Sequence, residues 1–229
     1  LEDPDFIYEL NSDCPGLLLI INNEHFYTEY RDEYIAQLSN FALKLDNRTG
    51  SEVDKDRLNA IFLDLGFKVR VETNKTHELM LEILKDTVKT FQYSSLFVAI
   101  LSHGDQGVIY GSNSIAIQIT EIQKIICDRQ LSGIPKVLLL QSCQGNNCQR
   151  VPKTTDLLTF RATILGYSAV RHRKKGTWFI QAFCNAVERY PKEDILEICT
   201  KVIAEVSKKK WGACMVPQVE TTFTKRLYL

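Results

Sequence analysis

The chain has 229 residues, of which 45% are hydrophobic, so it can bury one sizeable core. Lysine and arginine together number 28, as do aspartate and glutamate, and the formal net charge at pH 7 is therefore zero. A balanced charge gives no long-range attraction to nucleic acid or to an anionic membrane, and neither is an expected partner. We expect a single domain whose binding depends on local sites.

Seven cysteines are scattered along the chain, and an odd number in a chain of this length does not indicate a disulfide-stapled domain. This composition predicts free thiols in a cytoplasmic protein. The longest apolar runs, such as residues 17–21, are far shorter than the roughly 20 residues of a membrane span. Residues 1–4 do not resemble a signal peptide, and because Leu1 is not a natural start we expect a further N-terminal region that binds an adaptor.

Apolar segments rich in Leu, Ile and Val alternate with stretches at helical spacing, the pattern of strands buried on both faces by crossover helices. It predicts an α/β fold with a central, mostly parallel sheet. The predicted strands are, in chain order, 17–21, 67–71, 96–100, 136–140, 162–167 and 221–229. The predicted helices are one capped by Asp54 and stopped by Gly66, one capped by Thr76, one opened by a capping box at Thr120, and those at 176–190 and 191–206.

Two of the predicted strands are followed closely by residues that can do chemistry. His103 follows the strand 96–100, and Cys143 follows the strand 136–140. Ligands gather at the carboxyl ends of parallel strands, so both side chains are expected at one edge of the sheet. A thiolate is a nucleophile, and an imidazole can take its proton and return one to the leaving group. We therefore predict Cys143 as nucleophile, His103 as general acid and base, and the backbone N–H groups of Gly104 and Cys143 as oxyanion donors.

Plainer interpretations of these residues exist. A lone cysteine after a strand is usually inert, and a lone histidine usually only hydrogen-bonds, but the pair, each followed by glycine within two residues, is much rarer. Zinc binding by Cys143 and Cys148 with His103 or His172 is a competing hypothesis, and the absence of any C-x-x-C pair argues against it, so no metal or cofactor is predicted. No carboxylate lies at a helpful spacing to orient the imidazole, which leaves a backbone carbonyl as an option.

Five segments, in order along nearly the whole chain, resemble motifs of the caspase family of thiol proteases. They are the first-strand motif at 16–23, R-x-G-[TS]-x-x-D at 48–54, the histidine loop at 101–107, the nucleophile pentapeptide at 141–145, and the start of the small subunit's first helix at 176–181. The resemblance implies the three-layer caspase fold and a hydrolase that cleaves after aspartate, made as a zymogen and active as a homodimer or as a heterodimer with a caspase. Gln144 after the nucleophile, with residues 110–111, 193–196 and 205–207, is similar to the initiator members of the death-receptor branch, such as caspase eight, which act in apoptotic or immune signalling.

The resemblance also implies the residues that recognise the substrate. Arg48, Gln141 and Arg171 would bind the substrate aspartate, and paired guanidinium donors with an amide suit a carboxylate. Without the motifs, both arginines would be read as solvated loop charges. Val170 stands where the family has an aromatic wall, which predicts a wider and shallower neighbouring subsite, and Trp178 is a further substrate-binding residue.

The family's division into subunits maps onto 1–150 as the large-subunit-like region, 151–160 as a short linker and 161–229 as the small-subunit-like region. Caspases resembling this chain are cut at aspartates in a sizeable linker, yet Asp156 is the only aspartate between Cys143 and Trp178. Either the linker was removed, or the chain stays uncut and dimerisation alone rearranges the loops. The short linker and Val170 also motivate an alternative function, a regulatory or decoy protein that heterodimerises with an active caspase. The intact pair of Cys143 and His103 argues against it.

Overall fold

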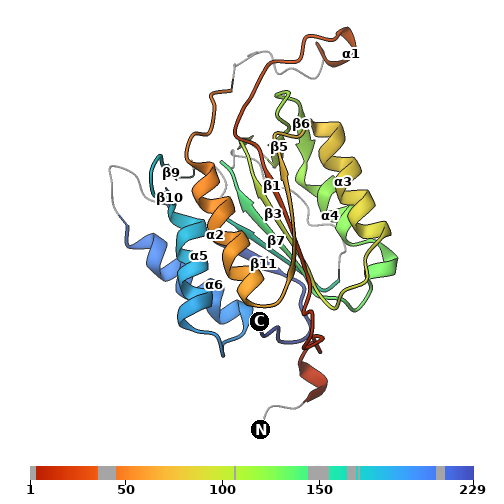
Figure 1. Cartoon of the computed structure of the whole chain (residues 1–229), viewed down its shortest axis with the longest axis vertical. Coiled ribbons are helices and arrows are strands. Elements are labelled where there is room, and N and C mark those ends of the chain that lie inside the picture. The colour runs from red at the N-terminus through yellow and green to blue at the C-terminus, as the bar shows by residue number, and fades with distance from the viewer. Residues whose placement is uncertain are drawn as a thin grey trace.

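A six-stranded sheet forms the centre of the molecule, with the strand order β11-β8-β7-β3-β1-β2 (Figure 1). The computed structural model describes residues 4–35, 45–105, 107–143, 155–163, 169, 171–209 and 215–229. Neighbouring strands run parallel except at β11, which is antiparallel to β8, so the predicted mostly parallel sheet is confirmed. The strands of this sheet are β1 (Leu17–Asn22), β2 (Lys68–Thr73), β3 (Leu96–Leu101), β7 (Lys136–Gln141), β8 (Leu157–Arg161) and β11 (Gln218–Thr221).

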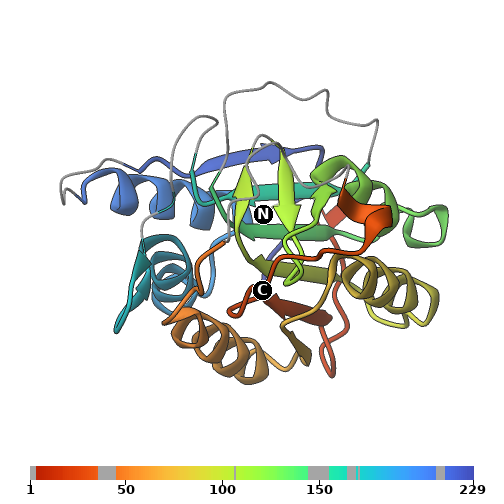
Figure 2. The ribbon, with the colours of Figure 1, turned by 90° about the horizontal axis from the view of Figure 1, so that it is seen from above.

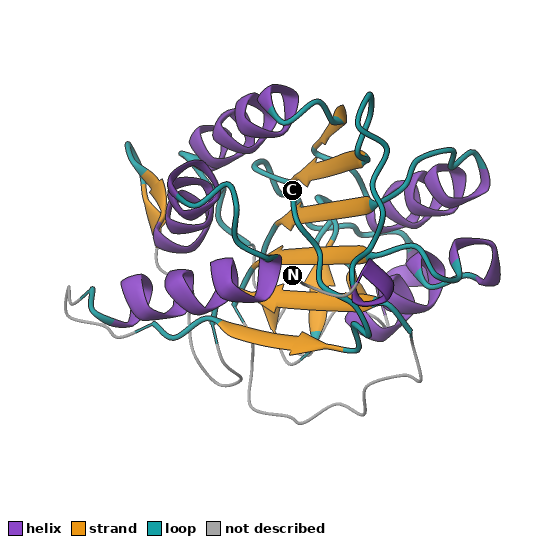
Figure 3. Ribbon diagram, turned by 90° about the horizontal axis from the view of Figure 1, so that it is seen from below, coloured by secondary structure: helices purple, strands orange, loops and turns teal. Residues whose placement is uncertain are grey.

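Helices cover both faces of the sheet, which is why its central strands are apolar throughout (Figures 2 and 3). Every residue of β3 and β7 is buried, and alternate side chains enter two separate cores. One core contains Phe97 and Val137 and is closed by α2, α5 and α6, while the other contains Val98 and Leu138 and is closed by α3 and α4. These helices are α2 (Ser51–Asp64), α3 (His77–Lys89), α4 (Ile119–Ile126), α5 (Trp178–Arg189) and α6 (Ile195–Ser207).

Several short strands and helices complete the described structure. A three-stranded antiparallel sheet and a two-stranded hairpin lie outside the main sheet. None of the helices in the described part of the chain has the length and apolar character needed to cross a membrane. The small elements are η1 (Pro4–Phe6), α1 (Asp32–Ile35), β4 (Gly104–Asp105), β5 (Val108–Tyr110), β6 (Ala116–Gln118), η2 (Arg129–Leu131), β9 (Arg171–His172) and β10 (Gly176–Thr177).

Two predicted helix ends are confirmed and one predicted cap is wrong. The Thr76 hydroxyl accepts a hydrogen bond from the Leu79 N–H at 3.3 Å, and α2 stops just before Gly66, whose φ is 82°. However, α2 begins earlier than predicted, with Gly50 as its N-cap. Asp54 lies inside the helix and is no cap, because its carboxylate binds the hairpin β9–β10 instead of the amides of its own first turn.

The capping box predicted at Thr120 is also wrong. Helix α4 begins at Ile119, directly after β6, and its N-cap Gln118 makes no side-chain hydrogen bond there. The Ile119 N–H donates to the Gly107 carbonyl at 2.9 Å. Because a backbone carbonyl outside the helix satisfies this N–H, the start of α4 depends on the neighbouring strands and not on a local cap.

The last two strands lie earlier in the sequence than predicted. Residues 157–161 form β8, of which 157–160 fall in the range assigned to the linker, whereas 164–168 lie outside the described residues. The strand was missed because its buried positions include Thr159 and Arg161, whose partners are Gln123 and Glu220. Similarly, β11 ends at Thr221, where the predicted strand begins, and only isolated bridges follow it.

Candidate active site

His103 and Cys143 lie at equivalent positions after two neighbouring parallel strands. Leu101 at the end of β3 pairs with Gln141 at the end of β7, and each candidate side chain comes two residues later. Both candidates are partly exposed. A Cβ atom on Gly104 would lie 2.9 Å from the carbonyl oxygen of Cys143, so a glycine is needed for the two loops to approach this closely. The structure thus brings the predicted pair to one edge of the sheet.

A backbone carbonyl holds the imidazole of His103. Its Nε2 atom lies 2.7 Å from the carbonyl oxygen of Asp46, and the ring of Phe26 packs edge-on against it with a centroid distance of 4.8 Å. A carbonyl oxygen only accepts hydrogen bonds, so Nε2 carries the proton and donates. This arrangement leaves Nδ1 of His103 as the nitrogen that can exchange a proton with a thiol.

The two ends of the segment 24–48, which supplies Asp46, are hydrogen-bonded to each other near His103. The Arg48 N–H donates to the Glu24 carbonyl at 2.7 Å, and the Phe26 N–H donates to the Asn47 side chain at 3.0 Å. These bonds place the beginning and the end of the segment 24–48 side by side. Phe26 and the carbonyl of Asp46 therefore reach His103 as parts of one loop.

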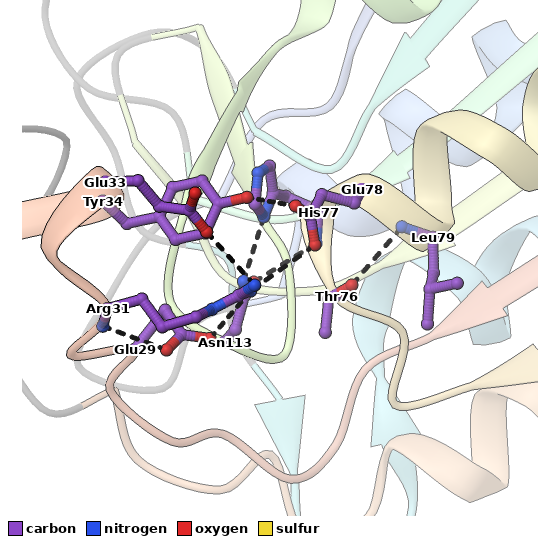
Figure 4. Close-up of polar contacts among 9 residues, drawn as sticks. All are labelled: Glu29, Arg31, Glu33, Tyr34, Thr76, His77, Glu78, Leu79 and Asn113. Carbon is purple, nitrogen blue, oxygen red and sulfur yellow. Dashed lines mark hydrogen bonds and ion pairs between the residues drawn. The ribbon is translucent and has the colours of Figure 1, made fainter.

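Residues 31–34 of this segment form polar contacts with the start of α3 (Figure 4). Arg31 forms an ion pair with Glu78 at 3.6 Å, and the Tyr34 hydroxyl donates a hydrogen bond to the same carboxylate. The Tyr34 ring meets the ring of His77 edge-on at 5.0 Å, and the His77 N–H donates to the Asn113 side chain at 3.2 Å. Each of these exposed contacts is weak on its own, but together they restrict where residues 31–34 can lie.

The residues expected to bind a substrate aspartate form a buried, positively charged group. Arg48 is only 2% exposed and donates a hydrogen bond to the Asn23 carbonyl at 3.1 Å, while Arg171 on β9 is partly buried. Burial and the charge of Arg171 lower the pKa of Arg48 to about 9. Within the described part of the chain neither guanidinium forms an ion pair, and the buried Gln141 amide oxygen has no hydrogen-bond partner. The charges of the two guanidinium groups are therefore offset only through space, by carboxylates such as that of Asp54.

Burial also lowers the pKa of His103, the charges of Arg48 and Arg171 lower it further, and the hydrogen bond to the Asp46 carbonyl opposes them. The two cations and the imidazole thus act on one another at the same sheet edge. A negative charge on Cys143 would raise the pKa values of both Arg48 and Arg171. An imidazole in such surroundings stays neutral to a lower pH than usual.

The remaining predicted residues are placed less completely. Trp178 is the first residue of α5, is partly exposed and lines a pocket together with His172, Lys175, Gln181 and Lys209. Val170 and Gln144 lie outside the described residues, and so does Cys148, one proposed ligand of the alternative zinc site. Among the residues that are described, no group of three or more His, Cys, Asp or Glu side chains could hold a metal ion.

Two contributors to the site had no sequence signal. The Asp46 carbonyl is a backbone atom that every residue type possesses, and Phe26 stands in a segment with no helical or strand periodicity. Asp54 did carry a signal, because it belongs to the motif 48–54, but its partners lie far away in sequence, with a separation of 123 for Thr177.

Known proteins similar to this chain agree with the geometry. The family model described as Caspase domain matches residues 15–228. The chain belongs to the caspase family. Caspase-8 of Drosophila melanogaster is 35% identical over 240 residues, covering 96% of this chain and 48% of the relative, and caspase-3 of Mus musculus is 28% identical over 256 residues, covering 98% and 87%. The crystal structure of caspase-1 from Spodoptera frugiperda superposes with a TM-score of 0.82 at 26% identity, covering all of this chain and 94% of that one.

These similarities confirm the predicted family and the caspase fold. Cysteine protease chemistry is the family's chemistry, and the likeness to caspase-8 extends to Drosophila pseudoobscura pseudoobscura at 32% identity. The caspase domain described here spans about half the length of these two Drosophila relatives, which are 48% and 46% covered.

We expect His103 to titrate below its ordinary pKa of 6.5, because burial and two neighbouring arginines disfavour the imidazolium form. The unfolded chain then binds a proton that the folded chain does not, so the free energy of unfolding falls as the pH drops from 6.5 toward the folded-state pKa. Nitrogen NMR of histidine-labelled protein measures the midpoint, and His103→Gln assigns the signal.

Urea denaturation of wild type and His103→Gln isolates the same effect, since the variant lacks the titrating group. The wild type should lose stability relative to the variant below pH 6.5 and not above it. A midpoint at or above the ordinary pKa would contradict the electrostatic account of the site.

Proposed function

We propose that this chain is a cysteine endopeptidase that cleaves peptide bonds after aspartate. The observation that carries the proposal is the pair of guanidinium groups, Arg48 and Arg171, which lie beside Cys143 without an anionic partner of their own in the described part of the chain. A substrate aspartate supplies the missing carboxylate, and two planar guanidinium groups can bind it through several charge-assisted hydrogen bonds. The Gln141 amide adds unused hydrogen-bonding capacity at the same edge.

In this mechanism Nδ1 of His103 takes the proton of the Cys143 thiol, and the resulting thiolate attacks the carbonyl carbon after aspartate. A C–S bond forms as the carbonyl oxygen becomes an oxyanion. The backbone N–H groups of Gly104 and Cys143 donate to that oxyanion. His103 then gives its Nδ1 proton to the leaving amine as the C–N bond breaks, which leaves an acyl-enzyme. Water, losing a proton to the same imidazole, hydrolyses the thioester and restores the thiol.

The Asp46 carbonyl has a defined part in this sequence of steps. By accepting a hydrogen bond from the Nε2–H of His103 it fixes the tautomer and leaves Nδ1 for the reacting groups. A neutral carbonyl stabilises an imidazolium less than a carboxylate would, so the proton is passed on readily to the leaving amine.

We further propose an initiator-type caspase of apoptotic or immune signalling, whose partners are proteins with aspartate before the scissile bond. The 35% identity to a caspase-8 supports this class. None of the five described cysteines forms a disulfide, which suits a cytoplasmic location. In the described part of the chain β11 is an edge strand that pairs with β8 alone, so a second copy, or another caspase, can add its own edge to form a dimer from the zymogen. An adaptor would bind through a region that precedes this domain.

We expect purified protein, dimerised by a kosmotropic salt, to cleave a fluorogenic peptide ending in aspartate and not the matched peptide ending in asparagine. Cys143→Ala should lower kcat by at least about 10³-fold, because it removes the thiolate that forms the acyl-enzyme. If wild type shows no turnover that depends on Cys143, the protease proposal fails. Should the same protein change the activity of an added active caspase, the regulatory alternative takes its place.

Arg171→Ala should lower kcat/KM for the aspartate peptide by about 10²-fold, since removing one partner of a desolvated charge pair typically costs about 2–5 kcal/mol. The matched control is Arg173→Ala, whose side chain is exposed in the turn of the same hairpin. Steady-state kinetics of both variants provide the comparison. An equal loss in the two variants would show that general charge on the hairpin, and not a pocket at Arg171, governs activity.

A further inference from the structure

We propose that Asp54 is the positioning residue of the aspartate pocket, holding the hairpin that carries Arg171 against the segment that carries Arg48. This inference rests on the proposed function of the two arginines. Asp54 belongs to α2, which begins three residues after Arg48, and its carboxylate reaches across to the hairpin β9–β10. One side chain therefore connects the two parts of the chain that would bind the substrate carboxylate.

The carboxylate of Asp54 is buried and accepts several hydrogen bonds from the hairpin and from α5. Asp54 is 0% exposed, and the Thr177 N–H donates to both of its carboxylate oxygens, at 2.9 and 3.0 Å. The Gln181 amide donates to the same carboxylate at 2.9 Å. Three donor contacts on a buried carboxylate fix its position far more firmly than one ion pair at a surface would.

The hairpin transmits this position directly to Arg171. In the antiparallel pairing of β9 with β10, Thr177 lies opposite Arg171. The amide that Asp54 binds thus belongs to the residue across the ladder from the pocket arginine. A shift of the Thr177 backbone moves the backbone of Arg171 with it.

Two glycines show how closely the hairpin lies on the start of α2. Gly176 has a φ of 76°, and a Cβ there would come within 2.3 Å of Asp54 Oδ1. Gly50 has a φ of 92°, and a Cβ there would come within 2.2 Å of the Arg173 carbonyl oxygen. Side chains at these positions would push the hairpin away from α2. Glycine at both positions therefore allows the close contact around Asp54.

Asp54 also offsets charge without blocking the pocket. Its negative charge favours the charged forms of both Arg48 and Arg171. It forms no ion pair with either of them in the described structure, because its oxygens accept from Thr177 and Gln181 instead. The carboxylate of Asp54 therefore does not occupy the guanidinium N–H groups that would bind a substrate carboxylate.

The test measures peptide binding in the Cys143→Ala background, where no turnover intervenes, by fluorescence anisotropy with peptides ending in aspartate or asparagine. Asp54→Asn keeps the size of the side chain but turns an NH2 group toward donors. We expect the preference for aspartate to fall by at least about tenfold. The control Asp64→Asn, an exposed position at the end of α2, should leave the preference unchanged.

Rescue separates positioning from simple loss of stability. Combining Asp54→Asn with Gln181→Glu moves the carboxylate to the other side of the same hydrogen bond. The amide introduced on α2 can then donate to the carboxylate introduced on α5, and its oxygen can still accept from Thr177. The double variant should recover most of the aspartate preference. If Asp54→Asn keeps the full preference, or if the double variant is no better than the single one, Asp54 is not a positioning residue.

The same titration distinguishes failure of the proposed function. A background protein that binds both peptides equally has no aspartate pocket, which removes both the function and the positioning role. If the Cys143→Ala protein prefers aspartate and adding Asp54→Asn leaves that preference unchanged, only the positioning role is overturned.

An independent observation concerns Asp156, the only acidic residue between Cys143 and Trp178. We infer that it is a buried structural residue that an aspartate-directed protease cannot use to divide the folded chain. Asp156 is 8% exposed with a φ of 56°, and its carboxylate accepts a hydrogen bond from the Tyr8 hydroxyl at 2.7 Å. A substrate aspartate must enter a protease cleft in an extended conformation with its carboxylate free.

Both sides of the peptide bond after Asp156 are held by the fold. The Asp156 carbonyl accepts from the Lys136 N–H at 2.8 Å, and the Leu157 N–H donates to the Thr222 hydroxyl at 3.2 Å. Cleavage here requires these bonds to break and β8 to leave the sheet. The bond is therefore protected by tertiary structure and not by its sequence.

Incubation with an active caspase followed by intact mass measurement tests this inference. The folded chain should yield no fragment ending at Asp156, while a synthetic peptide of residues 150–161 should be cut there. Tyr8→Phe, which removes the hydrogen bond to the carboxylate, should be cut faster than wild type. Cleavage of the folded wild type after Asp156, or resistance of the peptide, would overturn it.

Discussion

The pairing of β3 with β7 is the constraint on which the rest of the site depends. Both strands are buried along their whole length, so their register is fixed by two cores at once, and a slip of one residue would turn every side chain to the wrong core. The register that results sets Leu101 opposite Gln141, and therefore His103 opposite Cys143. Hydrophobic burial along the strands therefore positions the thiol and the imidazole at the same sheet edge, and no special contact between the two groups is needed.

The fold places the positive charges of Arg48 and Arg171 at the same sheet edge, although burial disfavours the charged form of each side chain. Removing Arg48 from water is costly, and its lowered pKa of about 9 reflects both its burial and the neighbouring Arg171. The fold compensates only in part, through the Asn23 carbonyl and the nearby charge of Asp54. A site with cations held in place but incompletely neutralised attracts a carboxylate more strongly than one whose charges are already paired. Under the proposed function, stability lost in the free protein becomes affinity for the substrate aspartate.

Sequence reasoning could locate the parts of this molecule that depend on local pattern. The apolar runs of β3 and β7, the residues that follow them and the Thr76 cap are all legible in short windows, and the structure has them where they were predicted. Strand β8 was misplaced because Thr159 and Arg161 interrupt its apolar character, and their partners are distant in sequence. Asp54 looked like a helix cap for the same reason, since nothing within its own helix points to Thr177. The Asp46 carbonyl had no signature at all, and only the option of a backbone carbonyl was open.

Two of the buried aspartates, Asp54 and Asp156, are stabilised in the same way. A carboxylate removed from water must find donors, and both Asp54 and Asp156 find them across long stretches of chain, at separations of 123 and 148 residues. In each case the bond crosses from the part of the chain before Cys143 to the part that follows it. The pairing of β7 with β8 crosses in the same way. The two halves of the domain are therefore held together by buried polar contacts and a shared sheet, so the geometry around Cys143 rests on tertiary contacts and does not require the connection between the halves to be short or long.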